Sequence, residues 1–167
     1  MTYSLQNLVT DIKTILLRVG IEKGSDQVCY FVQKALIDQN FIPMNLSDRK
    51  KGIAEREILY EDKELGFCIC GHVYDKKANG YPHDHGSSWA IYGQATGETE
   101  MTDWKIVKKI EETIFVKLDR TYIMKPGDVH YYACGKVHSP KREDPVKLLR
   151  IEGKNLDNVK RSNIKVL

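Results

Sequence analysis

The segment GYPHDHGSSW, residues 80–89, contains the residues whose types and spacing best suit chemistry. His83 and His85 are two positions apart, so their imidazoles would project from the same face of a β-strand. Two neutral imidazoles side by side can chelate a divalent ion such as Fe(II), Ni(II), Cu(II) or Zn(II). Asp84 would point to the opposite face, where we expect a structural role or an acceptor for a neighbouring backbone group. The alternative is a solvated turn that carries three polar residues.

A second segment, MKPGDVHYYACGKVHSP, lies further along the chain at residues 124–140. Pro126 and Gly127 predict a tight turn, and a histidine, either His130 or His138, stands after it. A proline-preceded His-x-His, then a Pro-Gly turn and a late histidine, resembles the two-part signature of the cupin superfamily. The resemblance implies a jelly-roll barrel, or double-stranded β-helix, that binds a metal through histidines.

The first cupin motif usually carries a glutamate soon after its second histidine. This chain has no acid in GSSWAIYG, residues 86–93, and Glu98 comes too late to take the role. A site of three histidines without a carboxylate resembles the cysteine-dioxygenase-like thiol dioxygenases. The stretches HDHGSSWAIYGQATGE and PGDVHYYACGKVHSPKREDPVKLLRIEGKNL follow the outline of that family, over roughly residues 55–156.

This resemblance implies three ligands, His83, His85 and His138. His138 is favoured as the third because Gly135 and the strand that follows match the layout of the dioxygenases. His130 is the alternative third ligand, since many cupins place their last ligand directly after the turn. Whichever of the two is not a ligand is expected to be a histidine of the barrel wall.

Three further residues are candidates for catalytic or substrate contacts. The dioxygenases hold the substrate carboxylate with an arginine at the start of a strand, and Arg56 has a comparable place; an arginine can hold a carboxylate with two parallel bonds. Its alternative is an exposed strand arginine. His72 and Tyr74 alternate with Cys68 and Cys70 along one predicted strand and so share a face. The two cysteines are expected to pack as small apolar residues, although a Cys-x-Cys-x-His set also suggests zinc.

The chain also departs from the thiol dioxygenases. Their tyrosine after the third histidine would fall within residues 149–152, LRIE, and there is none; a cysteine that could cross-link to it is missing after His85. We therefore expect a mononuclear non-haem Fe(II) dioxygenase that uses O2 on a small anionic substrate, either a thiol carboxylate or an enolisable carbonyl. Ni, Zn, Cu and Mn are alternative metals. A non-catalytic small-molecule-binding or sensing cupin and a metal-free isomerase-like cupin are alternative functions.

The elements that must position these residues form a mainly β chain behind a helical segment. Apolar residues at spacings of three and four predict a helix that ends at Gly20 and a second helix that begins near Ser25 or Asp26. Short β-rich segments then alternate with turns, which predicts an antiparallel sandwich or barrel. The expected strands are 55–60, 67–74, 88–94, 99–107, 113–118, 121–124, 129–133 and 146–152.

Length and composition set the remaining expectations. The chain has 167 residues, of which 41% are hydrophobic and 29% charged, and its net charge is +3. We expect a single domain over 1–167, with a helical segment at 1–50 and the cupin barrel at 53–156. Basic residues are spread along the chain and no long apolar run or signal peptide is present. We therefore expect no nucleic acid or membrane partner, a cytoplasmic location and reduced cysteines. Analogy with cupin-like barrels suggests a homodimer.

Overall fold

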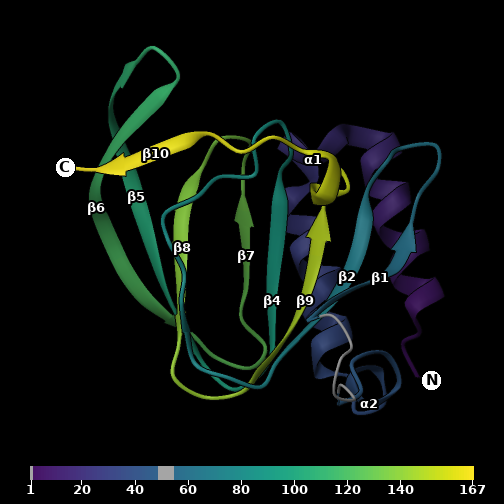
Figure 1. Ribbon diagram of the computed structural model, residues 1–167. Helices are drawn as coiled ribbons and strands as arrows, with labels where there is room; N and C mark the ends of the chain where they lie inside the picture. Colours follow the sequence, from purple (N-terminus) through teal and green to yellow (C-terminus); the bar gives the residue numbers. More distant parts are fainter. Residues whose placement is uncertain (1, 49–54) are drawn as a thin grey trace.

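Two five-stranded sheets curve around a shared interior in the computed structural model, which describes residues 2–48 and 55–167 (Figure 1). The first sheet has the strand order β1-β2-β9-β4-β7 and the second has the order β10-β6-β5-β8-β3. The strands are β1 (Arg56–Glu61), β2 (Cys68–Tyr74), β3 (Ala78–Asn79), β4 (Ala90–Thr96), β5 (Thr99–Ile110), β6 (Thr113–Met124), β7 (Val129–Tyr132), β8 (Val137–Arg142), β9 (Val146–Glu152) and β10 (Asn163–Val166).

From β4 onward the chain crosses repeatedly between the two sheets. β4, β7 and β9 belong to the first sheet, whereas β5, β6 and β8 belong to the second. The pairs β4–β7, β4–β9, β5–β6 and β5–β8 are antiparallel, whereas β10 pairs with β6 in parallel. Closure by such crossings is the jelly-roll solution to unpaired sheet edges. The mainly β fold class, a jelly-roll barrel with N-terminal helices, is therefore confirmed.

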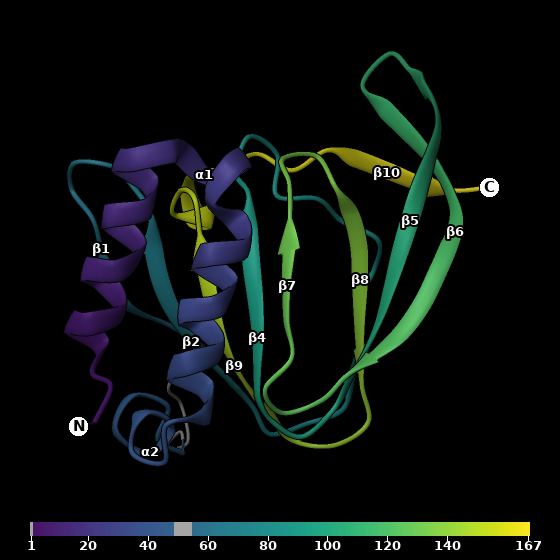
Figure 2. The ribbon, with the colours of Figure 1, turned by 180° about the vertical axis from the view of Figure 1, so that it is seen from behind.

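The helices cover the outer face of the first sheet (Figure 2). They are α1 (Leu5–Ile37) and α2 (Phe41–Asn45), and a 3-10 turn, η1 (Leu156–Asn158), follows β9. One buried apolar cluster joins helix and sheet residues, among them Ile12, Val28 and Val32 from α1 with Ile69, Ile91, Leu149 and Ile151 from the strands. A Cβ on Gly93 in β4 would lie 2.9 Å from Val32 and Leu36, so the absence of a side chain there allows α1 to approach the sheet closely.

The sequence predicted the two N-terminal helices but misplaced the start of the second. Gly20 interrupts α1 with a φ of 71°, a backbone conformation that favours glycine, and the helix resumes immediately after it. Ser25 and Asp26 therefore lie inside the second half of α1 rather than at its start. Arg18 donates to Gln27 across the bend at 2.5 Å, which shows that the two halves fold back on each other.

Several strand predictions also need correction. Residues 113–118 and 121–124 belong to one continuous strand, β6, because its pairing with β5 carries the chain through the polar residues between them. β3, β8 and β10 were not among the expected strands. His83 and His85 lie in the loop before β4 rather than within a strand; only His83 forms an isolated β-bridge. The predicted barrel start at residue 53 lies outside the described residues.

No helix in the described part of the chain has the length and apolar character that a membrane span requires.

Candidate metal centre

Three histidines from two distant segments meet inside the barrel. His83 and His85 come from the loop before β4, and His138 comes from β8. One nitrogen from each ring lies within 4.8 Å of one nitrogen from each of the others. The ring centroid of His138 is 4.7 Å from that of His83 and 4.8 Å from that of His85. Among the residues that the structure describes, this is the one His, Cys, Asp or Glu group whose ligand atoms converge in this way.

Backbone pairing explains why His83 and His138 lie side by side. The His83 amide donates to the His138 carbonyl at 3.0 Å, and the His138 amide donates back to the His83 carbonyl at 3.0 Å. Residues directly opposite in an antiparallel bridge project their side chains to the same face. The bridge therefore aligns the two imidazoles although the two histidines lie far apart in the sequence.

Hydrogen bonds from Gly86 and Ser162 to Asp84 hold the loop that carries His83 and His85. The Asp84 carboxylate accepts from the Gly86 amide at 3.1 Å, from the Ser162 amide at 3.0 Å and from the Ser162 hydroxyl at 2.6 Å. The predicted structural role of Asp84 as a backbone acceptor is confirmed. His83 itself is oriented by a contact of 2.9 Å between its Nδ1 atom and the Tyr81 carbonyl. That contact places the proton on Nδ1 and leaves the Nε2 lone pair available to a metal.

Burial keeps these histidines neutral at physiological pH. Desolvation is the largest cause that lowers the pKa of His85, which falls to about 3, and the Arg150 charge adds to it. Burial and the two neighbouring imidazoles also hold the pKa of His138 well below its usual range. The pKa of His83 is lowered mainly by burial. Neutral imidazole is the form that binds metals, so this donor set fits a divalent cation.

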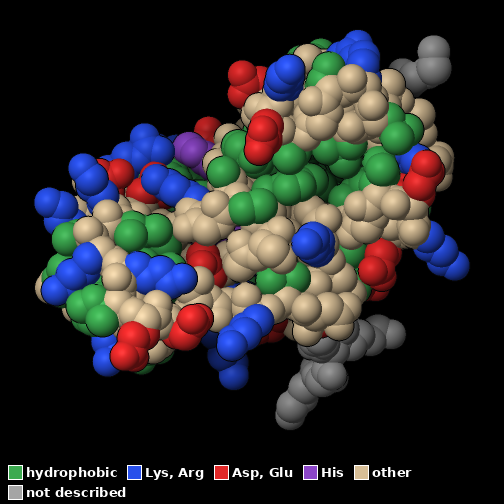
Figure 3. All heavy atoms as spheres, turned by 90° about the horizontal axis from the view of Figure 1, so that it is seen from above, with side chains coloured by type: hydrophobic (Ala, Val, Ile, Leu, Met, Phe, Trp, Pro, Cys, Tyr) green, Lys and Arg blue, Asp and Glu red, His purple; other side chains and the backbone are tan. Residues whose placement is uncertain are grey.

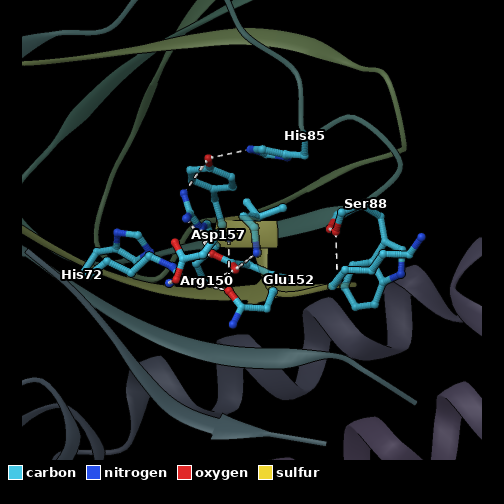
Figure 4. Close-up of polar contacts among 12 residues, drawn as sticks. His72, His85, Ser88, Arg150, Glu152 and Asp157 are labelled. Carbon is cyan, nitrogen blue, oxygen red and sulfur yellow. Dashed lines mark hydrogen bonds and ion pairs between the residues drawn. The ribbon is translucent and has the colours of Figure 1, made fainter. Parts of the chain in front are cut away.

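Tyr92 and Arg150 are part of the site and were not predicted from the sequence. The Tyr92 hydroxyl lies 3.1 Å from His85 Nε2 and 3.3 Å from His138 Nε2, and it accepts from Arg150 Nη1 at 3.1 Å. The remaining Arg150 nitrogens donate to Glu152, at 2.9 Å from Nε and 2.6 Å from Nη2 (Figure 4). Tyr92 and Arg150 are register partners in β4 and β9. The predicted strands contained both residues, but only strand pairing makes them neighbours.

The other predicted site residues form contacts of their own. Arg56 donates to both oxygens of Glu152, at 3.2 Å from Nε and 2.7 Å from Nη2, and to Asp157 at 2.8 Å. Its guanidinium is thus already engaged by carboxylates of the chain. His72 and Tyr74 contact each other, with 2.9 Å between His72 Nδ1 and the Tyr74 hydroxyl. Figure 4 shows His72 on the far side of Arg150 from His85.

His130, the alternative third ligand, lies on β7 with its ring centroid 4.7 Å from that of Tyr122. It is not a member of the converging group. Cys68 and Cys70 are fully buried, and burial raises the pKa of the Cys70 thiol to about 12, which suits a packed, neutral thiol. Neither cysteine joins a converging metal-ligand group within the described ranges.

No protein-family model matches the chain, and no curated protein matches it. Several solved structures that resemble the chain are named as cupin proteins. A cupin superfamily protein from Desulfitobacterium hafniense is 13% identical, with a TM-score of 0.47 over 65% of this chain and 84% of that one. An uncharacterised double-stranded β-helix protein from Klebsiella pneumoniae is 14% identical, with a TM-score of 0.48 over 71% and 90%. KdgF from Halomonas is 17% identical, with a TM-score of 0.45 over 71% and 87%. Similarity at this level carries no functional argument.

Acidification is expected to destabilise the metal-free protein through these histidines. Their folded-state pKa values are lowered, so the stability contribution is present above the unfolded value, near 6.5, and is lost as the pH falls toward about 3 for His85. The buried His85 imidazole should cost about 1.4 kcal/mol per pH unit in that window. Urea unfolding of the EDTA-treated protein at about pH 7 and about pH 5 measures the slope. A His85→Gln variant that keeps the full slope would contradict the assignment.

Proposed function

We propose that the chain is a metal-dependent cupin, a mononuclear non-haem Fe(II) dioxygenase that acts on a small anionic substrate. The convergence of His83, His85 and His138, all neutral and without a carboxylate among them, carries this proposal. Iron accepts imidazole ligands, and Ni, Zn, Cu and Mn are alternatives that the donor set also fits. A bound Fe(II) would supply electron donation to dioxygen and a template for the substrate.

The charge balance of the site favours an anionic substrate. Three neutral imidazoles leave the full charge of a divalent ion uncompensated. The nearby acids are engaged elsewhere, since Asp84 accepts from Gly86 and Ser162 and Glu152 pairs with two arginines. Positive charge attracts an anion to such a site.

A further positive charge stands close to the partly exposed side of the site. Arg161 is exposed and its charge acts on both His83 and His85, where it lowers the pKa of each. No acidic side chain in the described part of the chain forms an ion pair with Arg161. Viewed from above, a histidine side chain reaches the surface among both basic and acidic side chains (Figure 3). A thiol carboxylate or an enolate would meet attractive charge on approach.

The side chains of this site have separable roles in the proposal. His83, His85 and His138 would hold the metal, and Asp84 would fix the loop through Ser162. Burial of His85 and His138 would keep water away from the reacting atoms. Arg56, His72 and Tyr74 stay candidates for substrate contacts; Arg56 would have to exchange a carboxylate of Glu152 or Asp157 for that of the substrate.

Oxygen uptake by the Fe(II)-loaded protein tests this function. We expect uptake with at least one member of a panel of thiol carboxylates and enolisable carbonyls, because an anionic substrate is needed to prime Fe(II) for O2. The metal-free protein and a His85→Ala variant are the controls and should be silent. Fe(II) retention with silence across the panel would favour a sensing cupin. A protein that takes up no Fe(II) would favour an isomerase-like cupin in which the histidines act as acid and base.

A further inference from the structure

The Tyr92 hydroxyl lies beside two of the three imidazoles that would hold the metal. It is 3.1 Å from His85 Nε2 and 3.3 Å from His138 Nε2, so two imidazole nitrogens converge on one oxygen. Their Nε2 atoms therefore point into a common space. His83 directs its Nδ1 at the Tyr81 carbonyl, which again leaves Nε2 as the nitrogen that can bind a metal. The Tyr92 oxygen and the Nε2 atoms of His85 and His138 thus belong to one cluster.

The separations between the Tyr92 oxygen and two of the imidazole nitrogens match those of ligands around a single ion. Metal–nitrogen and metal–oxygen bonds of about 2.0 to 2.2 Å, at octahedral or tetrahedral angles, separate neighbouring ligand atoms by about 2.8 to 3.6 Å. Both measured separations from the Tyr92 oxygen fall in that interval.

Arg150 holds the oxygen in this place. Its Nη1 atom donates to the Tyr92 hydroxyl at 3.1 Å, and its guanidinium carbon is 5.2 Å from the centre of the Tyr92 ring. Glu152 in turn anchors Arg150 with two hydrogen bonds. Because Arg150 is always a donor, the hydroxyl proton of Tyr92 points away from it and toward the histidines. Arg150 is therefore a positioning residue for the Tyr92 oxygen.

We propose that Tyr92 is a fourth protein ligand of the metal, beside His83, His85 and His138. This inference rests on the proposed metal site and adds to it an oxygen donor that replaces the glutamate absent from residues 86–93. When the oxygen binds, the phenolic proton is released to solvent and the charge of the site falls by one. An octahedral ion would keep two open positions, which suits dioxygen and a substrate that binds through one atom.

The visible absorption spectrum of the iron-loaded protein tests the inference without any measurement of enzymatic activity. Phenolate bound to Fe(III) gives a visible charge-transfer band, whereas imidazole alone does not. The protein is loaded with Fe(II), oxidised with ferricyanide and desalted, and its iron content and visible spectrum are measured. We expect a coloured wild-type protein and a Tyr92→Phe variant that retains iron but lacks the band. The Zn(II) affinity of Tyr92→Phe should fall by at least about 10-fold. Loss of a residue that only supports the metal ligands already weakens metal binding by about that factor, and loss of a ligand should cost no less.

Tyr132→Phe is the matched control. Tyr132 is also buried and its ring stacks on His138 with 4.1 Å between centroids, but its hydroxyl bonds to the Tyr122 hydroxyl at 2.6 Å. This variant should keep both the band and the Zn(II) affinity. Resonance Raman excitation within the wild-type band should show phenolate ring modes, a result independent of any variant.

The outcomes separate this inference from the proposed function. Iron retained by the wild type without a charge-transfer band would overturn the Tyr92 ligand alone, and so would a band that persists in Tyr92→Phe. A wild-type protein that retains neither iron nor Cu(II), which also forms coloured phenolate complexes, would overturn the metal site and this inference together.

Discussion

Metal binding should be lost in His138→Ala and kept in His130→Ala. His138 lies in the group whose nitrogens converge within 4.8 Å, whereas the ring of His130 packs on Tyr122. Loss of a ligand should weaken the metal affinity by more than about 100-fold. Substitution of residues that only hydrogen-bond to metal ligands already weakens metal affinity by up to about that factor. Titration of both variants with Fe(II), followed by desalting and iron analysis, measures the difference.

The two substitutions form a matched pair, since each removes one imidazole from a barrel strand. His83→Ala and His85→Ala should behave like His138→Ala. Urea unfolding of the metal-free variants checks that lost binding does not come from lost folding. Retention of iron by His138→Ala, with loss in His130→Ala, would assign the third ligand to His130 instead and reject the centre described above.

Removal of the Glu152 charge should strongly lower the free energy of unfolding. Glu152 is fully buried and pairs with Arg150, which is 7% exposed, and with Arg56. Glu152→Gln would leave the Arg150 charge in the interior without a carboxylate, and such broken buried pairs cost about 3 to 5 kcal/mol. We expect that decrease in the free energy of unfolding, measured by urea denaturation at neutral pH.

Asp157→Asn is the control for this prediction. Asp157 also pairs with Arg56, but its side chain is 68% exposed, so solvent screens the pair and the loss should be much smaller. Equal losses in the two variants would show that burial does not govern the network. Burial raises the pKa of Glu152, yet the two arginines outweigh it and the pKa is lowered. The stabilisation is therefore present above its unfolded value and lost as the pH falls through the lowered value.

Glu152→Gln also reaches the metal site, because Arg150 connects Glu152 to Tyr92. If the hydrogen bonds from Arg150 position the Tyr92 oxygen, the Fe(III)-loaded variant should show a weakened or shifted charge-transfer band. The effect on colour is separate from the effect on stability, and it links the buried ion pairs to the proposed ligand.

Much of this architecture could be predicted from local patterns. Apolar spacing in the first forty residues indicated two helices, and alternation with turn residues indicated most strands of the barrel. The strands that were missed had weak local signals: β3 has two residues, and β8 contains Pro140 and charged residues. Long-range pairing with β5 makes β8 a strand, and no property of a short window reports such pairing.

The site divides in the same way. The His-x-His spacing and the turn at Pro126 and Gly127 are local properties of the sequence, and the resemblance to cupins that they carry implied a metal site of histidines without a glutamate. The resemblance already favoured His138 over His130, and the tertiary structure places His138 in the converging group. The backbone bridge that aligns His83 with His138 and the placement of Tyr92 and Arg150 came only from the tertiary structure. Cross-strand register decides these contacts, and register depends on packing across the whole barrel rather than on local spacing.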